Sequence, residues 1–338
     1  MVMVIPPSAL LLISETELKT TSRSVTTYLT LLRYWSVMAA GHSYWHVPQG
    51  LGSRFVPGVL AGYFNDMTAK ADWSGPIDNL GLPVARVNGT MQHFPTTILQ
   101  KGLGHWDRWL QAGRCKATEY EEFGRVARWA VETQDSRGGW PLSAVEPGAV
   151  SPYSAMIQGQ GISVLCRAYQ VTGSPEYLAT AVRAAKLMLT PVMQGGTSRP
   201  SSSGIILEEN PTRQPETVLN GWIFALFGLY DLAILSPDGD FLSPLSSSVS
   251  VLASVLPAFD AGFWSYYDLC GALASPFYHR LHIAQLRAMQ VAFSEHSRAF
   301  SSAADQFEHY LSGTRNRIRA VLTKGYQKLR NPPAVIVE

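Results

Sequence analysis

The sequence predicts an all-α protein: an (α/α) barrel, that is, a toroid of helix hairpins, with a short irregular and β-containing region before it. Two patterns predict this fold. A helical hydrophobic period runs from Pro95 nearly to the end of the chain, and a repeat of about 60 residues, two helices long, lies within it. Only 15% of the 338 residues are charged, with 9 Trp and 14 Tyr. This composition indicates either an aromatic-lined cavity or simply a large core.

The first 90 residues form the least regular part of the chain. We expect one helix at 22–40, then ordered loop or short strands at 41–64, a stretch rich in Gly, Pro and aromatic residues. Asn88-Gly89 is a turn signal. We therefore expect an N-terminal region, 1–90, packed on a barrel domain, 91–338.

From Pro95 onward the helical period predicts nine helices, at 96–110, 117–134, 154–173, 174–189, 217–232, 247–259, 278–293, 301–313 and 316–330. Their ends carry ordinary signals. Gly173 can end one helix, and Ser174 followed by Pro175 can begin the next.

Every second helix of this series has an unusual beginning. The helices that start near 96, 154, 217 and 279 carry glycine, amide or histidine residues early, namely Gln100, Gly102, Gln158, Gly159, Gln160, Gly161, Asn220, Gly221, His282 and Gln285. The helices between them are amphipathic covers. A two-helix period of this kind predicts stacked hairpins with one inner and one outer helix. Buried amides need partners, which a central polar cavity supplies. The alternative is close helix packing at glycine, with the amides bonded internally.

Three loops precede inner helices, at 138–156, 204–221 and 259–282. Because each enters a helix at its N-terminal end, we expect all three on one face of the ring. They bring carboxylates, phenols, imidazoles and aromatic faces together: Glu208, Glu209, Trp264, Tyr266, Tyr267, Asp268, Tyr278, His279 and His282. Such groups suit acid–base chemistry on a sugar. Alternatively, Glu208 and Glu209 are a solvated pair, and one of the adjacent tyrosines packs into the core.

Several classes of function are disfavoured. A net charge of +2 without interleaved basic and aromatic residues gives no reason to expect nucleic-acid binding. Three isolated cysteines form no disulfide framework. His279 and His282 have a spacing that could hold a metal, but no second ligand pair accompanies them, so we expect none. No nucleotide-binding or nucleophile-elbow motif is present. The apolar N-terminal stretch is too short for a membrane anchor, and we expect a cytoplasmic protein.

Four segments in order resemble the C-terminal signature of heparosan and heparan glucuronyl C5-epimerases. They are SAMIQGQGISVLCRAY, EENPTRQPETVLNGWIFALFGLYDL, LPAFDAGFWSYYDL and YHRLHIAQL. Upstream, HFPTTILQKGLGHWDRWL is similar to a further family segment. The resemblance implies an (α/α) barrel, in agreement with the repeat.

The resemblance also implies a reaction, the inversion of C5 in a glucuronyl residue to give iduronate, with no cofactor. By position it implies Glu209 as one base, Tyr278 as the acid on the other face, and Tyr267 as an assisting group. We expect the substrate, a glucuronate-containing glycan or a small molecule, to be contacted by His279, His282, Asn210, Asn220, Gln158, Gln160, Tyr153, Trp264, Tyr266 and His93. Whether the protein forms a homodimer is left open by the sequence.

Two positions depart from the family pattern. Asn210 stands where the family has a catalytic tyrosine, and Cys270–Gly271 stands where it has Arg-His. That arginine is a natural clamp for a uronate carboxylate. Arg213, Arg280 or Arg86 could replace it. The departures favour, as an alternative, an isomerase, cyclase or lyase acting on a small, less polar substrate; a non-catalytic glycan-binding protein is a second alternative. The basic run at 313–330 is either a surface for an anionic polymer or a solvated outer face.

Overall fold

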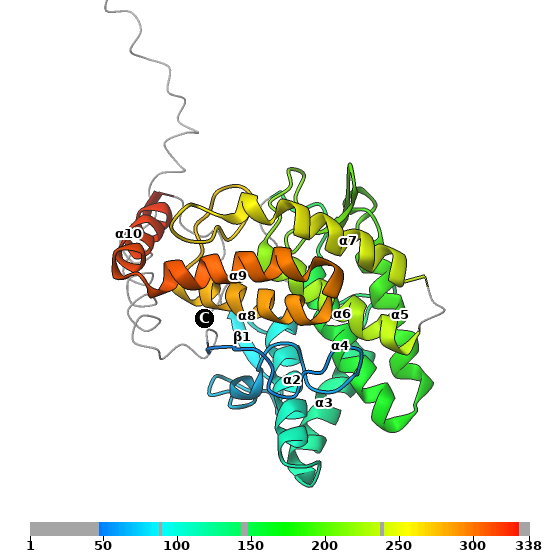
Figure 1. Cartoon of the computed structure of the whole chain (residues 1–338). Helices are drawn as coiled ribbons and strands as arrows, with labels where there is room; N and C mark the ends of the chain where they lie inside the picture. Colours follow the sequence, from blue (N-terminus) through cyan, green and yellow to red (C-terminus); the bar gives the residue numbers. More distant parts are fainter. Residues whose placement is uncertain (1–46, 88–89, 143–147, 237–239, 331–338) are drawn as a thin grey trace, which may run out of the picture. The chain divides into compact units, whose positions relative to one another are not determined.

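The computed structural model describes residues 47–87, 90–142, 148–236 and 240–330 (Figure 1). The chain divides into two compact units, Met1–His46 and Val47–Glu338. The first unit, and with it the helix expected at 22–40, lies outside the described residues. Residues 47–90 belong to the same compact unit as the helices that follow. The division expected between residues 90 and 91 stays a prediction.

The described residues are mostly helical, as the sequence predicts. The α-helices are α2 (Pro95–Gln111), α3 (Ala117–Thr133), α4 (Ala155–Thr172), α5 (Pro175–Leu189), α6 (Leu219–Leu235), α7 (Leu242–Val255), α8 (Pro276–Ala292), α9 (Ser297–Ser312) and α10 (Thr314–Arg330). Short 3-10 helices are η2 (Thr68–Ala71), η3 (Val192–Gln194), η4 (Leu256–Phe259) and η5 (Ser294–His296). Two antiparallel hairpins, β1 (Val84–Val87) with β2 (Thr90–His93) and β3 (Ser198–Ser201) with β4 (Gly204–Leu207), complete the elements.

The helices pack as hairpins whose first members form a row. Helix α2 pairs with α3, α4 with α5, α6 with α7, and α8 with α9, while α2, α4, α6 and α8 contact one another in that order (Figure 1). The row members are buried along most of their length, and their partners bury one face only. This is the alternation of inner and outer helices that the repeat predicts.

Glycines allow the closest approach in the row, between α4 and α6. A Cβ on Gly159 would lie 2.5 Å from the Phe224 carbonyl oxygen, and one on Gly228 would lie 2.3 Å from the Gly159 carbonyl oxygen. Both distances are far below van der Waals contact, so the two helix backbones can meet only because neither helix has a side chain at these positions. The glycine part of the packing alternative is thus confirmed at this crossing.

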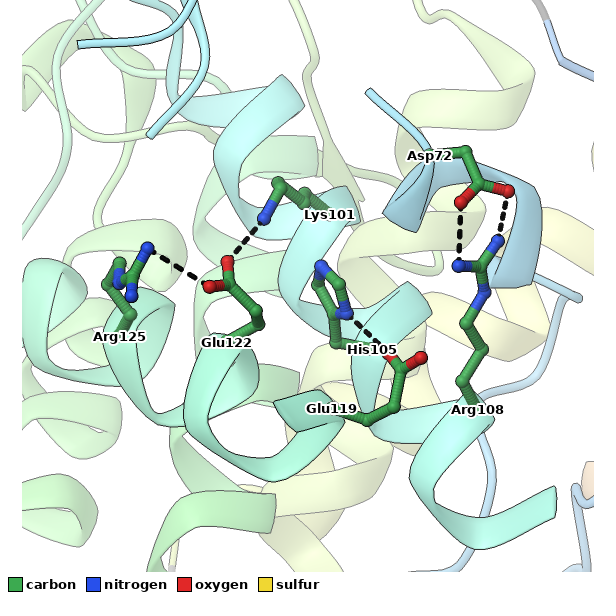
Figure 2. Close-up of polar contacts among 7 residues, drawn as sticks. All are labelled: Asp72, Lys101, His105, Arg108, Glu119, Glu122 and Arg125. Atoms are coloured by element: carbon green, nitrogen blue, oxygen red, sulfur yellow. Dashed lines mark hydrogen bonds and ion pairs between the residues drawn. The ribbon is translucent and has the colours of Figure 1, made fainter. Parts of the chain in front are cut away.

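Ion pairs join α2 to α3 and to Asp72, which follows η2, and one further pair lies within α3. Figure 2 shows them: Lys101 Nζ lies 2.7 Å from Glu122 Oε2, His105 Nδ1 lies 2.6 Å from Glu119 Oε2, and Arg125 and Arg108 pair with Glu122 and Asp72. The Lys101 side chain is only 9% exposed. Since an unpaired buried ammonium is costly, Glu122 is what allows a lysine there.

A buried ion pair fixes the segment before α2 to the helix row. Arg167 Nη1 on α4 lies 2.5 Å from Asp231 Oδ2 on α6, and its Nη2 donates to the Gly62 carbonyl at 3.2 Å. Next to it, the Tyr63 amide donates to Asp107 on α2 at 2.9 Å. Residues 47–72 are therefore held by polar bonds inside the core as well as by apolar packing.

Most predicted helix boundaries agree within a residue or two, but two helices begin earlier than expected. Helix α7 starts at Leu242, five residues before the predicted 247, and α9 at Ser297, four residues before 301. Both starts are rich in serine, a modest helix former, so their period is weak. By length and composition one described helical stretch, Leu242–Phe259, could cross a membrane, but core helices pass the same test, and α7 packs against β4, α6 and α9.

Candidate functional site

The three loops that enter α4, α6 and α8 meet, as predicted. The Ala155 amide at the start of α4 donates to the Glu208 carbonyl at 3.0 Å, and the Leu219 amide at the start of α6 donates to the Tyr267 carbonyl at 3.0 Å. The side chain of Ser275 caps α8 by accepting from the Tyr278 amide. The loop before α6 is thus bonded to the start of α4, and the loop before α8 is bonded to the start of α6.

Four of these side chains form a compact set, here called the Glu209 group: Glu209, Asn220, Tyr267 and Tyr278. The Tyr267 hydroxyl donates to Glu209 Oε1 at 3.5 Å, and the Asn220 amide donates to Oε2 at 3.5 Å. The rings of Tyr267 and Tyr278 meet edge to face, with centroids 4.9 Å apart. All three predicted catalytic residues thus lie together, with one predicted substrate-binding residue. Their roles stay predictions.

Gly221 makes room for the Glu209 carboxyl against α6. A Cβ at position 221 would lie 2.1 Å from Glu209 Oε2 and 2.6 Å from its Cβ. Glycine therefore lets the acid lie directly on the first turn of the helix, next to Asn220. The sequence pattern marks Gly221 as one of the early glycines of a row helix, but it does not show that the close approach is to the candidate base.

The electrostatic setting separates the roles of the acid and the phenol. Burial raises the pKa of Glu209 to about 7, the Tyr267 hydrogen bond opposes this, and the charge of Glu216 adds to it. Burial, followed by the charge of Glu209, raises the pKa of Tyr267 well above its usual 10. Near neutrality Glu209 can therefore exchange a proton in either direction, while Tyr267 keeps its proton and donates a hydrogen bond.

The neighbouring acid, Glu208, serves the loop and not the Glu209 group. Its side chain is fully buried and accepts from Arg199 Nε at 3.0 Å, from the Thr217 amide at 3.0 Å and from the Thr217 hydroxyl at 3.2 Å. Thr217 has φ +52°, a strained backbone for a β-branched residue, and these bonds hold it just before α6. The solvated-pair alternative is wrong for Glu208.

The two candidate histidines belong to an internal cluster. The Ser265 hydroxyl lies 2.8 Å from His279 Nδ1 and 2.9 Å from His282 Nδ1, and His279 Nε2 bonds to the Phe307 carbonyl at 3.0 Å. Trp264 stacks on His279 with ring centroids 3.7 Å apart. Burial lowers the pKa of His279 to about 4, so the ring is neutral. Both His279 nitrogens are thus engaged within the protein.

The histidines do not form a metal site in the part of the chain that the structure describes. No three His, Cys, Asp or Glu side chains gather there at a suitable distance. Ser265, which sequence reasoning missed, is what holds His279 and His282 together. It left no signal in the sequence because it lies 14 residues from the nearer histidine.

The remaining predicted substrate contacts fall in three places. Asn210 lies beside the Glu209 group, where its amide donates to Glu216 at 3.2 Å, and Tyr266 is half-buried in the same loop as Tyr267. Tyr153 donates to Asp135. His93 lies 2.8 Å from Asp78. No bond found within the described residues links Tyr153 or His93 to the Glu209 group.

The row helices bury polar atoms that lack partners within the described residues. They include both side-chain polar atoms of Gln160 on α4, the Oδ1 of Asn220 on α6, and Gln285 Oε1 and His282 Nε2 on α8. Gln285 also donates to the Asn220 carbonyl at 3.1 Å. Gln158, by contrast, bonds to the Trp140 backbone at 3.4 Å on both sides. Gln158 follows the packing alternative, and for the others the central polar cavity stays a prediction.

Comparison with known proteins identifies relatives of this chain. Residues 134–309 match the family model described as D-glucuronyl C5-epimerase C-terminus. A D-glucuronyl C5-epimerase of Caenorhabditis elegans is 34% identical over 219 residues, covering 57% of this chain and 35% of that protein. An uncharacterized protein of Methanocaldococcus jannaschii is 31% identical over 136 residues, covering 39% of this chain and 44% of that protein. The chain thus aligns with less than half the length of either relative.

Proposed function

Because the family model matches just over half of its residues, this chain belongs to the D-glucuronyl C5-epimerase C-terminus family, and we propose that it inverts C5 of a glucuronyl residue in a glycan. At family level it is a carbohydrate epimerase, an isomerase. The observation that carries the specific reaction is the Glu209 group: an acid with a pKa of about 7 beside two phenols. Substrate, reaction and residue roles are our proposal.

For the fold, we propose that the row α2, α4, α6 and α8 belongs to a closed (α/α) barrel. The consecutive contacts along the row and the outer partners of each hairpin support it. The buried polar atoms that lack partners among the described residues support a polar centre.

In the proposed mechanism Glu209 removes the C5 proton. The C5–H bond breaks, its proton goes to the Glu209 carboxylate, and its electron pair spreads into the sugar carboxylate as an enediolate. That anion needs hydrogen-bond donors, and Tyr267 keeps its proton for this task because its pKa is well above 10. Tyr278 then gives its proton to C5 from the opposite face, and solvent resets both groups.

This sequence of steps moves only protons, so we propose that no cofactor takes part. Asn220 holds the Glu209 carboxylate through its amide, and Gly221 lets that carboxylate lie on α6. Trp264 stacks on His279, and the Ser265 hydroxyl links His279 to His282. We propose that they fix the part of α8 that carries Tyr278.

A second function is favoured by the two departures from the family pattern. Asn210 is bonded to Glu216, and Cys270 is exposed in the loop beside Tyr267. With neither a tyrosine nor an arginine there, the same scaffold could act as an isomerase, cyclase or lyase on a small, less polar substrate. In that case a glucuronyl polymer would be neither bound nor changed.

The test is proton exchange at C5 in heavy water. Wild-type protein is incubated with several glucuronyl polymers, unsulfated and sulfated, and the C5 signals and iduronate content are followed by NMR. We expect deuterium at C5 and new iduronate signals, and neither with Glu209→Gln. A protein that binds a polymer but exchanges nothing is a glycan-binding protein; one that does neither supports the small-substrate alternative.

A further inference from the structure

The C-terminal helix α10 is attached to the loop that carries Tyr267. Gln327 donates from Nε2 to the Gly271 carbonyl at 3.0 Å and accepts at Oε1 from the Leu273 amide at 2.9 Å. The helix also contacts α8 and α9 (Figure 1). Most of α10 is exposed, which agrees with the solvated-face expectation, but this side of the helix is docked on the loop of the candidate site.

One turn before Gln327, Lys324 lies over the Tyr267 ring. Its Nζ is 5.8 Å from the ring centroid, at the outer limit of a cation–π contact. The residue is half-buried, and Asp268, the next residue of the loop, acts on it electrostatically. The Asp268 Oδ1 is already occupied by the amides of Cys270 and Ala272. Among the described residues no hydrogen bond or ion pair engages the Lys324 ammonium.

The Lys324 ammonium is charged at neutral pH. Its pKa is lowered to about 8, first by burial and then by the charge of nearby Lys328, while Asp268 opposes both effects. An anion placed beside Tyr267 would add to the stabilisation that Asp268 gives this half-buried ammonium. The Glu209 group thus has an acid, donors and, through α10, a cation at its edge.

We propose that Lys324 binds the carboxylate of the sugar at this site, together with the Tyr267 hydroxyl. The loop itself has Cys270 where an arginine was expected, so the charge would come from another element of the chain. Arg213 and Arg280, two other candidates for this task, are exposed. A cation beside the carboxylate would also stabilise the enediolate, since negative charge moves onto those oxygens. This assignment rests on the proposed function.

The test compares a glucuronyl oligosaccharide with its carboxyl-reduced, neutral counterpart by calorimetric titration. Wild-type protein should bind the acidic form at least tenfold more tightly than the neutral one. Lys324→Met should lose most of that preference and bind the neutral form as wild type does. Lys324→Arg should keep the preference within about threefold, because it preserves the charge. Lys328→Met, one turn further along α10, is the matched control and should bind like wild type.

The outcomes separate this assignment from the proposed function. If wild type prefers the acidic form and Lys324→Met keeps that preference, Lys324 is not the carboxylate ligand, while the epimerase proposal stands. If wild type shows no preference at all, both fail. Thermal unfolding of each variant guards against misfolding, and Lys324→Gln provides a second neutral variant with a polar end. A loss of preference shared equally by Lys328→Met would overturn the assignment as well.

Discussion

Replacing Glu209 with glutamine should abolish activity and yet stabilise the protein above neutral pH. The carboxyl has a raised pKa in the folded state, about 7 against an ordinary value of 4.5. Below pH 4.5 the carboxyl is protonated in both the folded and the unfolded chain, so it contributes nothing to the pH dependence of the free energy of unfolding. Between pH 4.5 and about 7 the unfolded chain ionises first, so the folded state loses stability as pH rises.

The size of the effect follows from the two pKa values. One pKa unit corresponds to about 1.4 kcal/mol, so the difference between 4.5 and about 7 amounts to at most about 3.5 kcal/mol in the free energy of unfolding. Partial solvent access at Glu209 reduces this figure. Glutamine has nearly the same shape and cannot ionise. Glu209→Gln should therefore remove the loss of folding stability above pH 7 and change the stability little at pH 4.5.

Urea unfolding of both proteins at pH 4.5, 6, 7 and 8 measures this directly. The variant should gain stability relative to wild type progressively, by about 1–3 kcal/mol at pH 8. Its C5 exchange rate should fall by at least about a hundredfold, the usual contribution of a general base. A stability difference that is constant across the pH range would show that Glu209 does not titrate near 7 in the folded protein, which would refute the raised pKa on which the prediction depends.

Three further variants test other parts of the structure. Tyr267→Phe should lower kcat by about 10- to 100-fold with a smaller effect on KM, measured by initial rates, because it removes a donor to the enediolate. Gly221→Ala should lower kcat by at least tenfold, because the added methyl group displaces the Glu209 carboxyl. The control is Gly124→Ala on α3, where the added Cβ would meet only an Arg128 nitrogen at 3.4 Å; it should leave the rate unchanged. Arg167→Met should cost about 3–5 kcal/mol in urea unfolding, since it leaves Asp231 buried and unpaired; an effect below about 1 kcal/mol would contradict this.

The helices and their pairing could be predicted from the sequence because they depend on local periodicity. The starts at Pro95 and Pro175 and the end at Gly173, which has φ +69°, are marked by residues that act within one turn. The start of α7 was missed because its serines carry no period. Closure of the row into a barrel is not a local property, and no pattern of spacing establishes it.

The candidate site could be predicted only as a set of loops. That Glu209, Tyr267 and Tyr278 lie together follows from two loops, 204–221 and 259–282, that enter the neighbouring helices α6 and α8 on one side. That Glu208 is structural does not follow, because its partner Arg199 lies on β3 and Thr217 takes an unusual backbone conformation. Lys324 was missed for a similar reason: its position depends on Gln327 docking α10, and a basic helix at the surface looks the same with or without such docking.

The most direct test of the proposed chemistry is the pH dependence of C5 exchange in heavy water. For wild-type protein with a glucuronyl polymer, kcat/KM for exchange should rise about tenfold per pH unit below a midpoint near 7, since Glu209 must be ionised to accept the proton. Glu209→Gln should show no exchange at any pH. Exchange that is flat through pH 7, or that survives in Glu209→Gln, would contradict the assignment of Glu209 as the base.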